Sequence, residues 1–319
     1  MITTITLNPA VDKTVEITDF EVGTVNRVSS IRLDAGGKGI NVSKVVSSLG
    51  GKSKAVGILG GRNGSFIKEY LDHTGIENEF LFVEGETRTN LKIVDNSRKT
   101  NTDINEAGPQ VSREALESVK RIAFGPLDGN SIVVFSGSVP ANVNKDLYGQ
   151  WITAAKEAGA KTMLDADGEL LRQGIQAGPF LVKPNIHELE GFFGKKIEGI
   201  QEAEKLGRSL IDTFGIQVVV VSLGAKGALF LNGECSLLAH SIEVDVKSTV
   251  GAGDSMVAAL AHSFDRGYGF EKAAALAMAA SAANVMTSGT QAADYETIVE
   301  LEKRVTFEYF MPITEKGSE

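Results

Sequence analysis

Short apolar runs alternate along the chain with longer segments whose apolar residues recur at helical spacing. The runs predict strands and the segments predict helices, an alternation typical of βαβ units and a mostly parallel sheet. Val218–Val221 contains no polar residue, as expected for a strand covered by helices on both faces. The predicted strands are Ile2–Leu7, Lys54–Ile58, Ser131–Phe135, Lys161–Leu164, Phe180–Val182 and Val218–Ser222. The predicted helices are Asn41–Leu49, Ser65–His73, Arg113–Phe124, Lys145–Ala158, Ala203–Phe214, Gly253–Phe264, Phe270–Met286 and Tyr295–Val305.

Two stretches break this alternation, because Lys13–Leu33 and Phe80–Asp103 contain strand-like patterns with no helix between them. We expect them to pair into a small separate sheet. Such a sheet has a face to bury and no helix to cover it, so it should close over a ligand as a lid or pack against a second copy. Residues 1–319 are therefore predicted to form one domain with lid segments at about 13–33 and 80–103, and to assemble as a homodimer. The polar end Glu315–Glu319 is expected to fray.

The charge balance excludes some partners. The chain has 32 Lys and Arg against 41 Asp and Glu, a net charge of −9, whereas nucleic-acid binders usually carry a basic stripe. The single cysteine, Cys235, excludes an intrachain disulfide and a cysteine-based zinc site. No apolar run reaches the roughly 18–20 residues of a membrane span, and the first residues lack a signal-peptide pattern. We expect a cytoplasmic protein without nucleic-acid or membrane partners.

The motif Val250–Ser255, Val-Gly-Ala-Gly-Asp-Ser, follows the β-like run Ile242–Val246 and opens a predicted helix. Glycines at a helix start leave backbone N–H groups uncovered, and these groups together with the helix dipole favour an anion. Asp254 has two interpretations. A carboxylate is common in the first turn of a helix, but beside an anion site it can also accept the proton of an attacking hydroxyl, as a kinase requires.

A second glycine cluster, Asp34–Asn41, surrounds Lys38 just before a helical segment. It is not a Walker A loop, and the nearest match to one, around Lys52, has Val46 in place of the first glycine. The chain has no Gly-x-Gly-x-x-Gly fingerprint, so a dehydrogenase would lack its cofactor motif.

Two further motifs follow predicted strands. In Lys183–Glu190, Asn185 and Glu188 are three residues apart, so their oxygens could hold Mg²⁺ directly or through water, or could simply begin a helix. The glycine-bearing turn Ser222–Ala228 suits close contact with a nucleotide, and equally a tight hairpin. The acidic segment Asp165–Gly168 is either a surplus of charge at such a site or a cap for the next helix.

Together and in this order, these motifs resemble those of the ribokinase-like, PfkB-type carbohydrate kinases. The resemblance covers essentially the whole chain, from Leu-Asn-Pro-Ala at residues 7–10 to the motif at Asp254. It implies a three-layer α/β/α fold with a mostly parallel central sheet and a small β-sheet lid. Within the phosphosugar branch of the family, the pattern Arg88-x-Asn90-x-Lys92 is most similar to the kinases of fructose 1-phosphate. The tagatose-6-phosphate kinases, the nearest alternative, share the N-terminal and glycine motifs but usually lack this one.

The resemblance implies ATP-dependent phosphorylation of fructose 1-phosphate at its 6-hydroxyl, with tagatose 6-phosphate or fructose 6-phosphate as alternative substrates. Asp254 would be the base, and Gly251, Ala252 and Gly253 would form the anion hole. Residues implied to bind the phosphosugar are Asp12, Gly37, Lys38, Asn41, Arg88, Asn90 and Arg27, of which Arg27 could act across a dimer interface. Residues implied to bind ATP are Lys183, Asn185, Ser222, Gly224, Gly227 and Asn284. Asn185 and Glu188 would hold Mg²⁺ through water.

An alternative from a different class is a sugar-phosphate sensor that kept the pocket and lost turnover. Asp254 favours the kinase, because a protein that only binds has no use for a base. Since the chain is acidic and both substrates are anions, the cleft must be locally positive, and Lys38, Arg88 and Lys183 are the expected cations.

Overall fold

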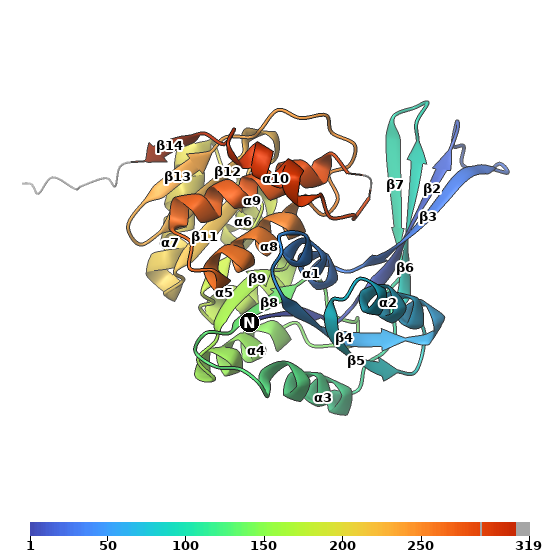
Figure 1. The fold of residues 1–319 in the computed structure, drawn as a ribbon, viewed down its shortest axis with the longest axis horizontal. Coiled ribbons are helices and arrows are strands. Elements are labelled where there is room, and N and C mark those ends of the chain that lie inside the picture. Colours follow the sequence, from blue (N-terminus) through green and yellow to red (C-terminus); the bar gives the residue numbers. More distant parts are fainter. Residues whose placement is uncertain (288, 311–319) are drawn as a thin grey trace, which may run out of the picture.

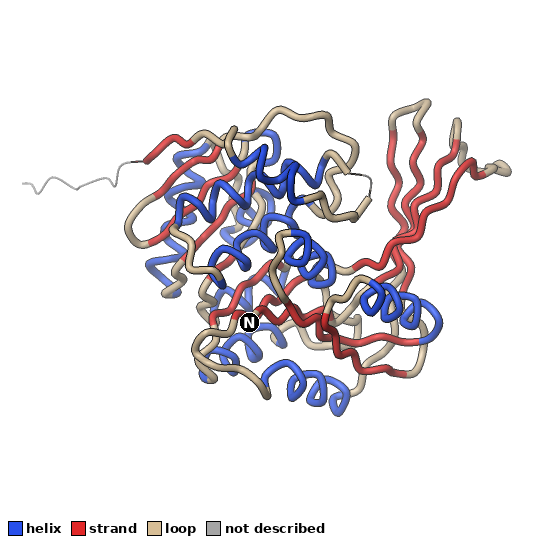
Figure 2. Tube along the Cα trace, viewed as in Figure 1, coloured by secondary structure: helices blue, strands red, loops and turns tan. Residues whose placement is uncertain are grey.

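The computed structural model describes residues 1–287 and 289–310, so the expected fraying at Glu315–Glu319 lies outside the described residues. Within them, the larger sheet has ten strands in the order β14-β13-β12-β11-β10-β9-β8-β1-β4-β5 (Figures 1 and 2). In this order, the strands β11, β10, β9, β8, β1, β4 and β5 run parallel to one another. The strands β12, β13 and β14 extend the sheet beyond β11, each antiparallel to its neighbour. The bounds are β1 Ile2–Thr6, β4 Ser53–Gly60, β5 Glu77–Val83, β8 Ile132–Ser136, β9 Lys161–Asp165, β10 Leu181–Val182, β11 Val218–Ser222, β12 Ala228–Asn232, β13 Ser236–Ala239 and β14 Phe307–Phe310.

Helices cover both faces of this sheet, which confirms the predicted three layers. Helices α1, α8, α9 and α10 pack on one face, and α3 to α7 pack on the other. Val218 and Val220 point into the first layer while Val219 and Val221 point into the second, which is why this strand is apolar throughout. The bounds are α1 Lys38–Ser48, α2 Gly61–His73, α3 Arg113–Phe124, α4 Leu147–Glu157, α5 Gly168–Gln176, α6 Ile186–Phe193, α7 Ile200–Phe214, α8 Ala252–Asp265, α9 Phe270–Val285 and α10 Tyr295–Glu302. None of the helices in the described part of the chain has the length and apolar character needed to cross a bilayer.

Two of the strand assignments made from the sequence were wrong. The β-like run 242–246 is not a strand, because the antiparallel partner of β12 is β13, and the chain leaves the sheet after Ala239. The turn after β11 forms a hairpin into β12, the second of the two interpretations of that motif. Residues 80–83 belong to β5 at the edge of the larger sheet rather than to the small one, because they pair in parallel with β4.

The smaller sheet, here called the lid, has the strand order β3-β2-β6-β7 and projects from the body beside α1 and α2 (Figure 1). Its strands are β2 Ala10–Ile17, β3 Val28–Gly36, β6 Arg88–Asp95 and β7 Thr100–Asn105. The strands β2 and β6 pair in parallel, and the two outer pairs are antiparallel. The two sequence stretches therefore combine into a separate sheet, as predicted.

The two faces of the lid differ in polarity. Register places Asp12, Asp34, Asn90 and Asn105 side by side on one face. The opposite face is apolar and includes residues that remain exposed. These exposed residues are Val28 at 44%, Ile31 at 59%, Leu33 at 49% and Ile104 at 53%.

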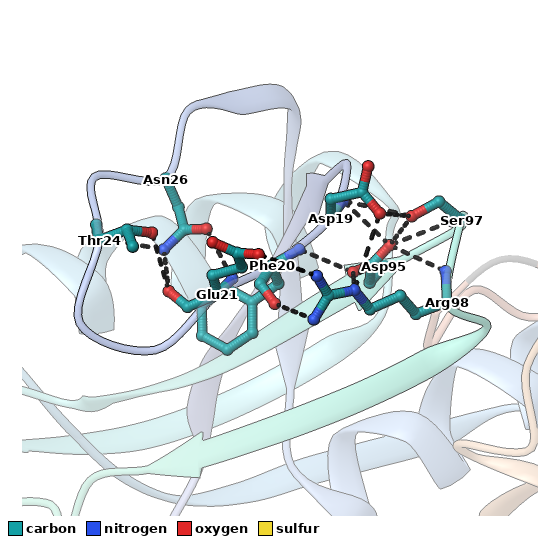
Figure 3. Close-up of polar contacts among 8 residues, drawn as sticks. All are labelled: Asp19, Phe20, Glu21, Thr24, Asn26, Asp95, Ser97 and Arg98. Atoms are coloured by element: carbon teal, nitrogen blue, oxygen red, sulfur yellow. Dashed lines mark hydrogen bonds and ion pairs between the residues drawn. The ribbon is translucent and has the colours of Figure 1, made fainter.

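The loop at the tip of the lid is fixed by Asp95, which accepts a 2.7 Å hydrogen bond from the backbone N–H of Phe20 (Figure 3). Asp95 also accepts from the hydroxyl of Ser97, and Arg98 donates to the carbonyl of Phe20 at 3.0 Å. The hydrogen bonds that Asp95 accepts lower its pKa, with the Ser97 hydroxyl as the largest cause. The tip is thus an ordered element, and it leaves Val22 91% exposed.

Candidate active site

Helix α8 begins after a residue in the left-handed backbone conformation. Gly251 is the N-cap residue and has φ +84°, a conformation that residues with a side chain rarely adopt. The N–H groups of Ala252 and Gly253 lie in the first turn, where a helix offers them no acceptor, at the positive end of the dipole. A Cβ placed on Gly253 would lie 3.3 Å from Nζ of Lys183, so a cation borders the same turn. This turn is therefore suited to an anion.

The carboxylate of Asp254 lies in the same turn and is 7% exposed. Its Oδ2 accepts a 2.8 Å hydrogen bond from Nδ2 of Asn41 in α1. Burial, helped by the negative charge of Asp165, raises the pKa of Asp254 to about 6 against the opposing effects of Lys38, Asn41 and Lys183. A carboxylate with this pKa is ionised at neutral pH and remains able to accept a proton.

Asp165, at the end of β9, joins the two site lysines. Its Oδ1 lies 3.4 Å from Nζ of Lys38 and 3.2 Å from Nζ of Lys183. Burial acts to raise the pKa of Asp165, but the two ammonium groups outweigh it and hold the pKa below its ordinary value. The charge of Asp165 in turn raises the pKa of Lys38. Asp165 is thus a counter-ion, whereas Asp167 of the same acidic segment is the N-cap residue of α5, without a side-chain capping hydrogen bond.

Asn185 and Glu188 form a capping box at the start of α6. Asn185 Oδ1 accepts from the N–H of Glu188 at 2.9 Å, and Glu188 Oε2 accepts from the N–H of Asn185 at 2.7 Å. Burial raises the pKa of Glu188, and the negative charge of Asp165 adds to that effect. The described residues contain no group of three or more acidic, His or Cys side chains that could enclose a metal. The donor set fits Mg²⁺ held through its own water molecules, with the second oxygen of Glu188 as acceptor.

A cavity of about 760 Å³ opens beside the N-terminal turn of α8. Its lining includes Ser222, Gly224 and Gly227, three of the residues predicted to bind ATP, together with Ala252 and Gly253. The irregular segment that was predicted as a strand at 242–246 supplies part of its wall. Asn284 lies differently: it is 2% exposed, does not line this cavity and has its side chain beneath Gly251. Its Nδ2 donates to the carbonyl of Gln291 at 3.1 Å.

A second cavity, of about 230 Å³, lies under the polar face of the lid and reaches Val250, next to the glycine turn. Asp12 and Asn90 both line it, and Asn90 Nδ2 donates to Asp12 Oδ1 at 3.0 Å. Burial raises the pKa of Asp12. A Cβ on Gly36 would overlap the Asp12 carboxylate, which explains a glycine there.

The predicted phosphate cations lie in different places. Gly37 is the N-cap of α1, so Lys38 and Asn41 stand in its first turn. Arg88, at the start of β6, donates to the carbonyls of Asn8 at 3.2 Å and Glu106 at 3.3 Å, and it forms no ion pair among the described residues. Arg27 is exposed in the loop before β3 at the far end of the lid. This chain therefore does not bring Arg27 to the other site residues.

Motif reasoning missed Lys44, a lysine that is only 6% exposed. Its ammonium group donates to the carbonyl of Ala35 and to Asn41 Oδ1, the latter at 3.4 Å. The only signal in the sequence was its position three residues after Asn41, on the same side of a predicted helix.

A family model described as pfkB family carbohydrate kinase matches residues 3–298. A 1-phosphofructokinase of Borreliella burgdorferi is 38% identical over 90% of this chain and 92% of its own length. A 1-phosphofructokinase of Escherichia coli K12 is 35% identical over 97% of this chain and 98% of its own. The solved structure of the tetrameric inhibited form of E. coli phosphofructokinase-2 covers 95% of this chain and 98% of its own, with a TM-score of 0.89 and 26% identity.

Proposed function

Because the chain belongs to the pfkB family of carbohydrate kinases, we propose that it is a 1-phosphofructokinase, which transfers the γ-phosphoryl group of ATP to the 6-hydroxyl of fructose 1-phosphate. One observation carries the proposal. The buried carboxylate of Asp254 stands in the same helix turn as the N–H groups of Ala252 and Gly253, so a base and an anion site adjoin each other. Phosphoryl transfer requires mainly positioning and charge stabilisation, and this turn offers both.

Asp254 is the base in this proposal. It accepts the proton of the 6-hydroxyl while that oxygen forms a bond to the γ-phosphorus and the bond from the phosphorus to the bridging oxygen of ADP breaks. The N–H groups at residues 251–253 and the ammonium of Lys183 stabilise the charge on the transferred group. Closure of the lid would exclude water, which otherwise competes as acceptor.

The two cavities provide separate places for the two substrates. We assign the 760 Å³ cavity, with Ser222, Gly224 and Gly227, to the nucleotide. We assign the cavity under the lid to the sugar, where Asp12 and Asn90 face its hydroxyls. The Asn41 amide group has a second hydrogen besides the one directed at Asp254, so it can also bind a sugar hydroxyl. Gly37 contributes by its lack of a side chain, which lets the sugar approach the backbone closely. Asn284 supports Gly251 from below.

The phosphate of the sugar is assigned to Arg88 and Lys38. The guanidinium of Arg88 is bound only to backbone carbonyls among the described residues, so its charge is available for an anion. Mg²⁺ is assigned to Glu188 and Asn185 through water, where it would neutralise charge on the ATP phosphates. We place the protein in the cytoplasm, where ATP is available as donor, and the single cysteine is compatible with that reducing compartment.

We also propose that the chain forms a homodimer through the apolar face of the lid. The polar face covers the sugar cavity, so the exposed Ile31, Leu33 and Ile104 need another cover, and a second lid offers the same surface. The likeness to a protein solved as a tetramer supports an oligomer. In the dimer, Arg27 on the ordered tip would reach the phosphate site of the partner.

The activity is tested by a coupled assay of ADP release with fructose 1-phosphate, fructose 6-phosphate and tagatose 6-phosphate. The highest kcat/KM is expected with fructose 1-phosphate, and absence of turnover with that sugar would refute the proposal. The dimer is tested by light scattering on the Leu33→Asp variant, which should be monomeric. Ser30→Asp places the same charge on the other face of β3 and should leave the dimer intact. A wild-type monomer would contradict the assembly without affecting the activity.

A further inference from the structure

Lys44 combines features that packing alone does not account for. It lies in the middle of α1 with 6% exposure, and a buried lysine is costly unless its charge has partners. Burial lowers the pKa of Lys44 to about 8, although nearby Asp34, Asp12 and Asp254 oppose the change. No described residue forms an ion pair within 4 Å with it. Its hydrogen bonds go instead to the carbonyl of Ala35 and to the side chain of Asn41.

The hydrogen bonds of Asn41 have a direction that Lys44 determines. An amide side chain has one accepting oxygen and one donating NH₂ group, and the two can exchange places by rotation. The protonated ammonium of Lys44 can only donate, so below its pKa of about 8 the Asn41 oxygen must face Lys44. The NH₂ group must then face the other way, where it donates to Asp254 Oδ2 at 2.8 Å. In the reversed orientation the amide oxygen would face the carboxylate and repel it.

We propose that Lys44 is a positioning residue for the phosphoryl-transfer reaction, which holds the Asn41 amide so that its NH₂ group donates to Asp254 and keeps this base ionised. The carbonyl of Ala35, at the base of the lid, holds the ammonium in place. The inference rests on the proposed function, because it takes Asp254 as the base. Lys44 itself does not touch the reacting atoms.

Other charged groups surround both Asp254 and Lys44. Asp254 is faced by Lys38 from α1, Asp165 from β9 and Lys183 after β10. Lys44 is faced by Asp34 of β3 and Asp12 of β2. The ring of Tyr70 in α2 also lies 5.1 Å from the ammonium of Lys44. Because the variants below leave all of these groups in place, a change in the titration of Asp254 reports on Lys44 and Asn41.

The test compares Lys44→Met, Lys44→Arg and the wild type by the pH dependence of kcat/KM for fructose 1-phosphate. In Lys44→Met the side chain at position 44 cannot donate a hydrogen bond to Asn41. The acidic limb of the pH profile should therefore move to higher pH by about one to two units. The activity should then fall roughly three- to thirtyfold at pH 6.5 and less than twofold at pH 9. Lys44→Arg keeps the donor and should restore the wild-type limb. The phosphate of the substrate also titrates near pH 6, so the shift is measured as a difference between variants.

Two controls separate the outcomes. Lys205→Met removes an exposed charge from α7 and should leave the limb unchanged. In an Asn41→Ala background, Lys44→Met should shift the limb by less than half as much as it does alone, because the amide that transmits its effect is absent. An equal loss of activity at every pH, or full additivity with Asn41→Ala, would overturn the proposal.

A second measurement does not depend on turnover and can therefore be made on variants with little activity. The ¹³C chemical shift of the Asp254 carboxyl, assigned with Asp254→Asn, should titrate at higher pH in Lys44→Met than in the wild type and in Lys44→Arg. Should Lys44→Met not fold, Lys44→Leu and the Asn41→Ala single variant are titrated in the same way, and an unmoved Asp254 in any folded one contradicts the proposal. Wild-type turnover in the same assay tests the proposed function by itself, so the two failures are distinguishable.

Discussion

Asp254→Asn should abolish most activity and at the same time stabilise the fold. The exchange keeps the shape of the side chain, and its amide oxygen can still accept from Asn41, but it removes the base. A positioned base contributes about 10²- to 10⁴-fold, so kcat should fall by at least about a hundredfold with little change in KM. The stability effect arises because the fold raises the pKa of Asp254 from 3.8 to about 6.

This difference corresponds to a cost on the order of 2–3 kcal/mol for holding the ionised carboxylate in the native state. The sign follows from proton binding. Between about pH 4 and 6 the native state retains a proton that the unfolded chain has lost, so wild-type stability falls as the pH rises through this range. Above about pH 6 the full cost is present. The Asp254→Asn variant lacks this ionisation. Its free energy of unfolding should therefore exceed that of the wild type by an amount that grows from pH 4 to 6 and then stays constant.

The assay is the free energy of unfolding from denaturant titrations at several pH values, alongside kcat and KM at pH 7.5. Asp212→Asn makes the same chemical change at an exposed position of α7 and should alter neither property. The reasoning is refuted if Asp254→Asn turns over at a near-normal rate, or if its stability relative to the wild type is independent of pH between 4 and 7.

Three other perturbations probe the charges of the site. Asp165→Ala leaves two site lysines without their counter-ion and should destabilise the fold by about 3 kcal/mol or more, measured by denaturant unfolding; an unchanged midpoint would contradict the pairing. Arg88→Ala should raise KM for the phosphosugar about tenfold or more with KM for ATP unaffected, while Arg113→Ala at an exposed position of α3 should change neither; an unaltered KM would place the phosphate elsewhere. Glu188→Gln should increase the Mg²⁺ concentration needed for half-maximal rate, and an unshifted Mg²⁺ titration would remove Glu188 from the metal site.

Much of the fold was predictable because its signals are local. The apolar runs of the parallel strands and the helical spacing around them gave six of the strands to within two residues at either end, and helix α3 was predicted with its observed bounds. The antiparallel strands β12, β13 and β14 were not predicted. β12 and β13 are short and buried along almost all of their residues, so they show no alternation of apolar and polar positions. β14 is the edge strand and pairs with a strand about seventy residues earlier.

The candidate site also has a part that could be predicted from local sequence and a part that could not. The glycine turn at Gly251–Asp254 and the capping pair Asn185 and Glu188 are built from residues close in sequence, so their spacing alone indicated their local geometry. The role of Asp165 could not be read in this way, because its partners Lys38 and Lys183 lie on two other elements. Asn284, predicted to bind ATP, is buried beneath Gly251 and does not line the 760 Å³ cavity, and nothing in a helical pattern tells which buried polar residue lies beneath a loop.

By itself, the sequence determined the alternation of parallel strands and helices, the existence of a separate lid and the glycine turn that leaves N–H groups free for an anion. Tertiary structure alone decided the electrostatic state of the site. Burial at the junction of α1, α8 and β9 removes Asp254, Asp165 and Lys44 from water. This loss of solvent raises the pKa of Asp254 and lowers that of Lys44, while at Asp165 the two neighbouring lysines outweigh it. Desolvation depends on what surrounds a side chain in space, and spacing along a chain carries no information about it.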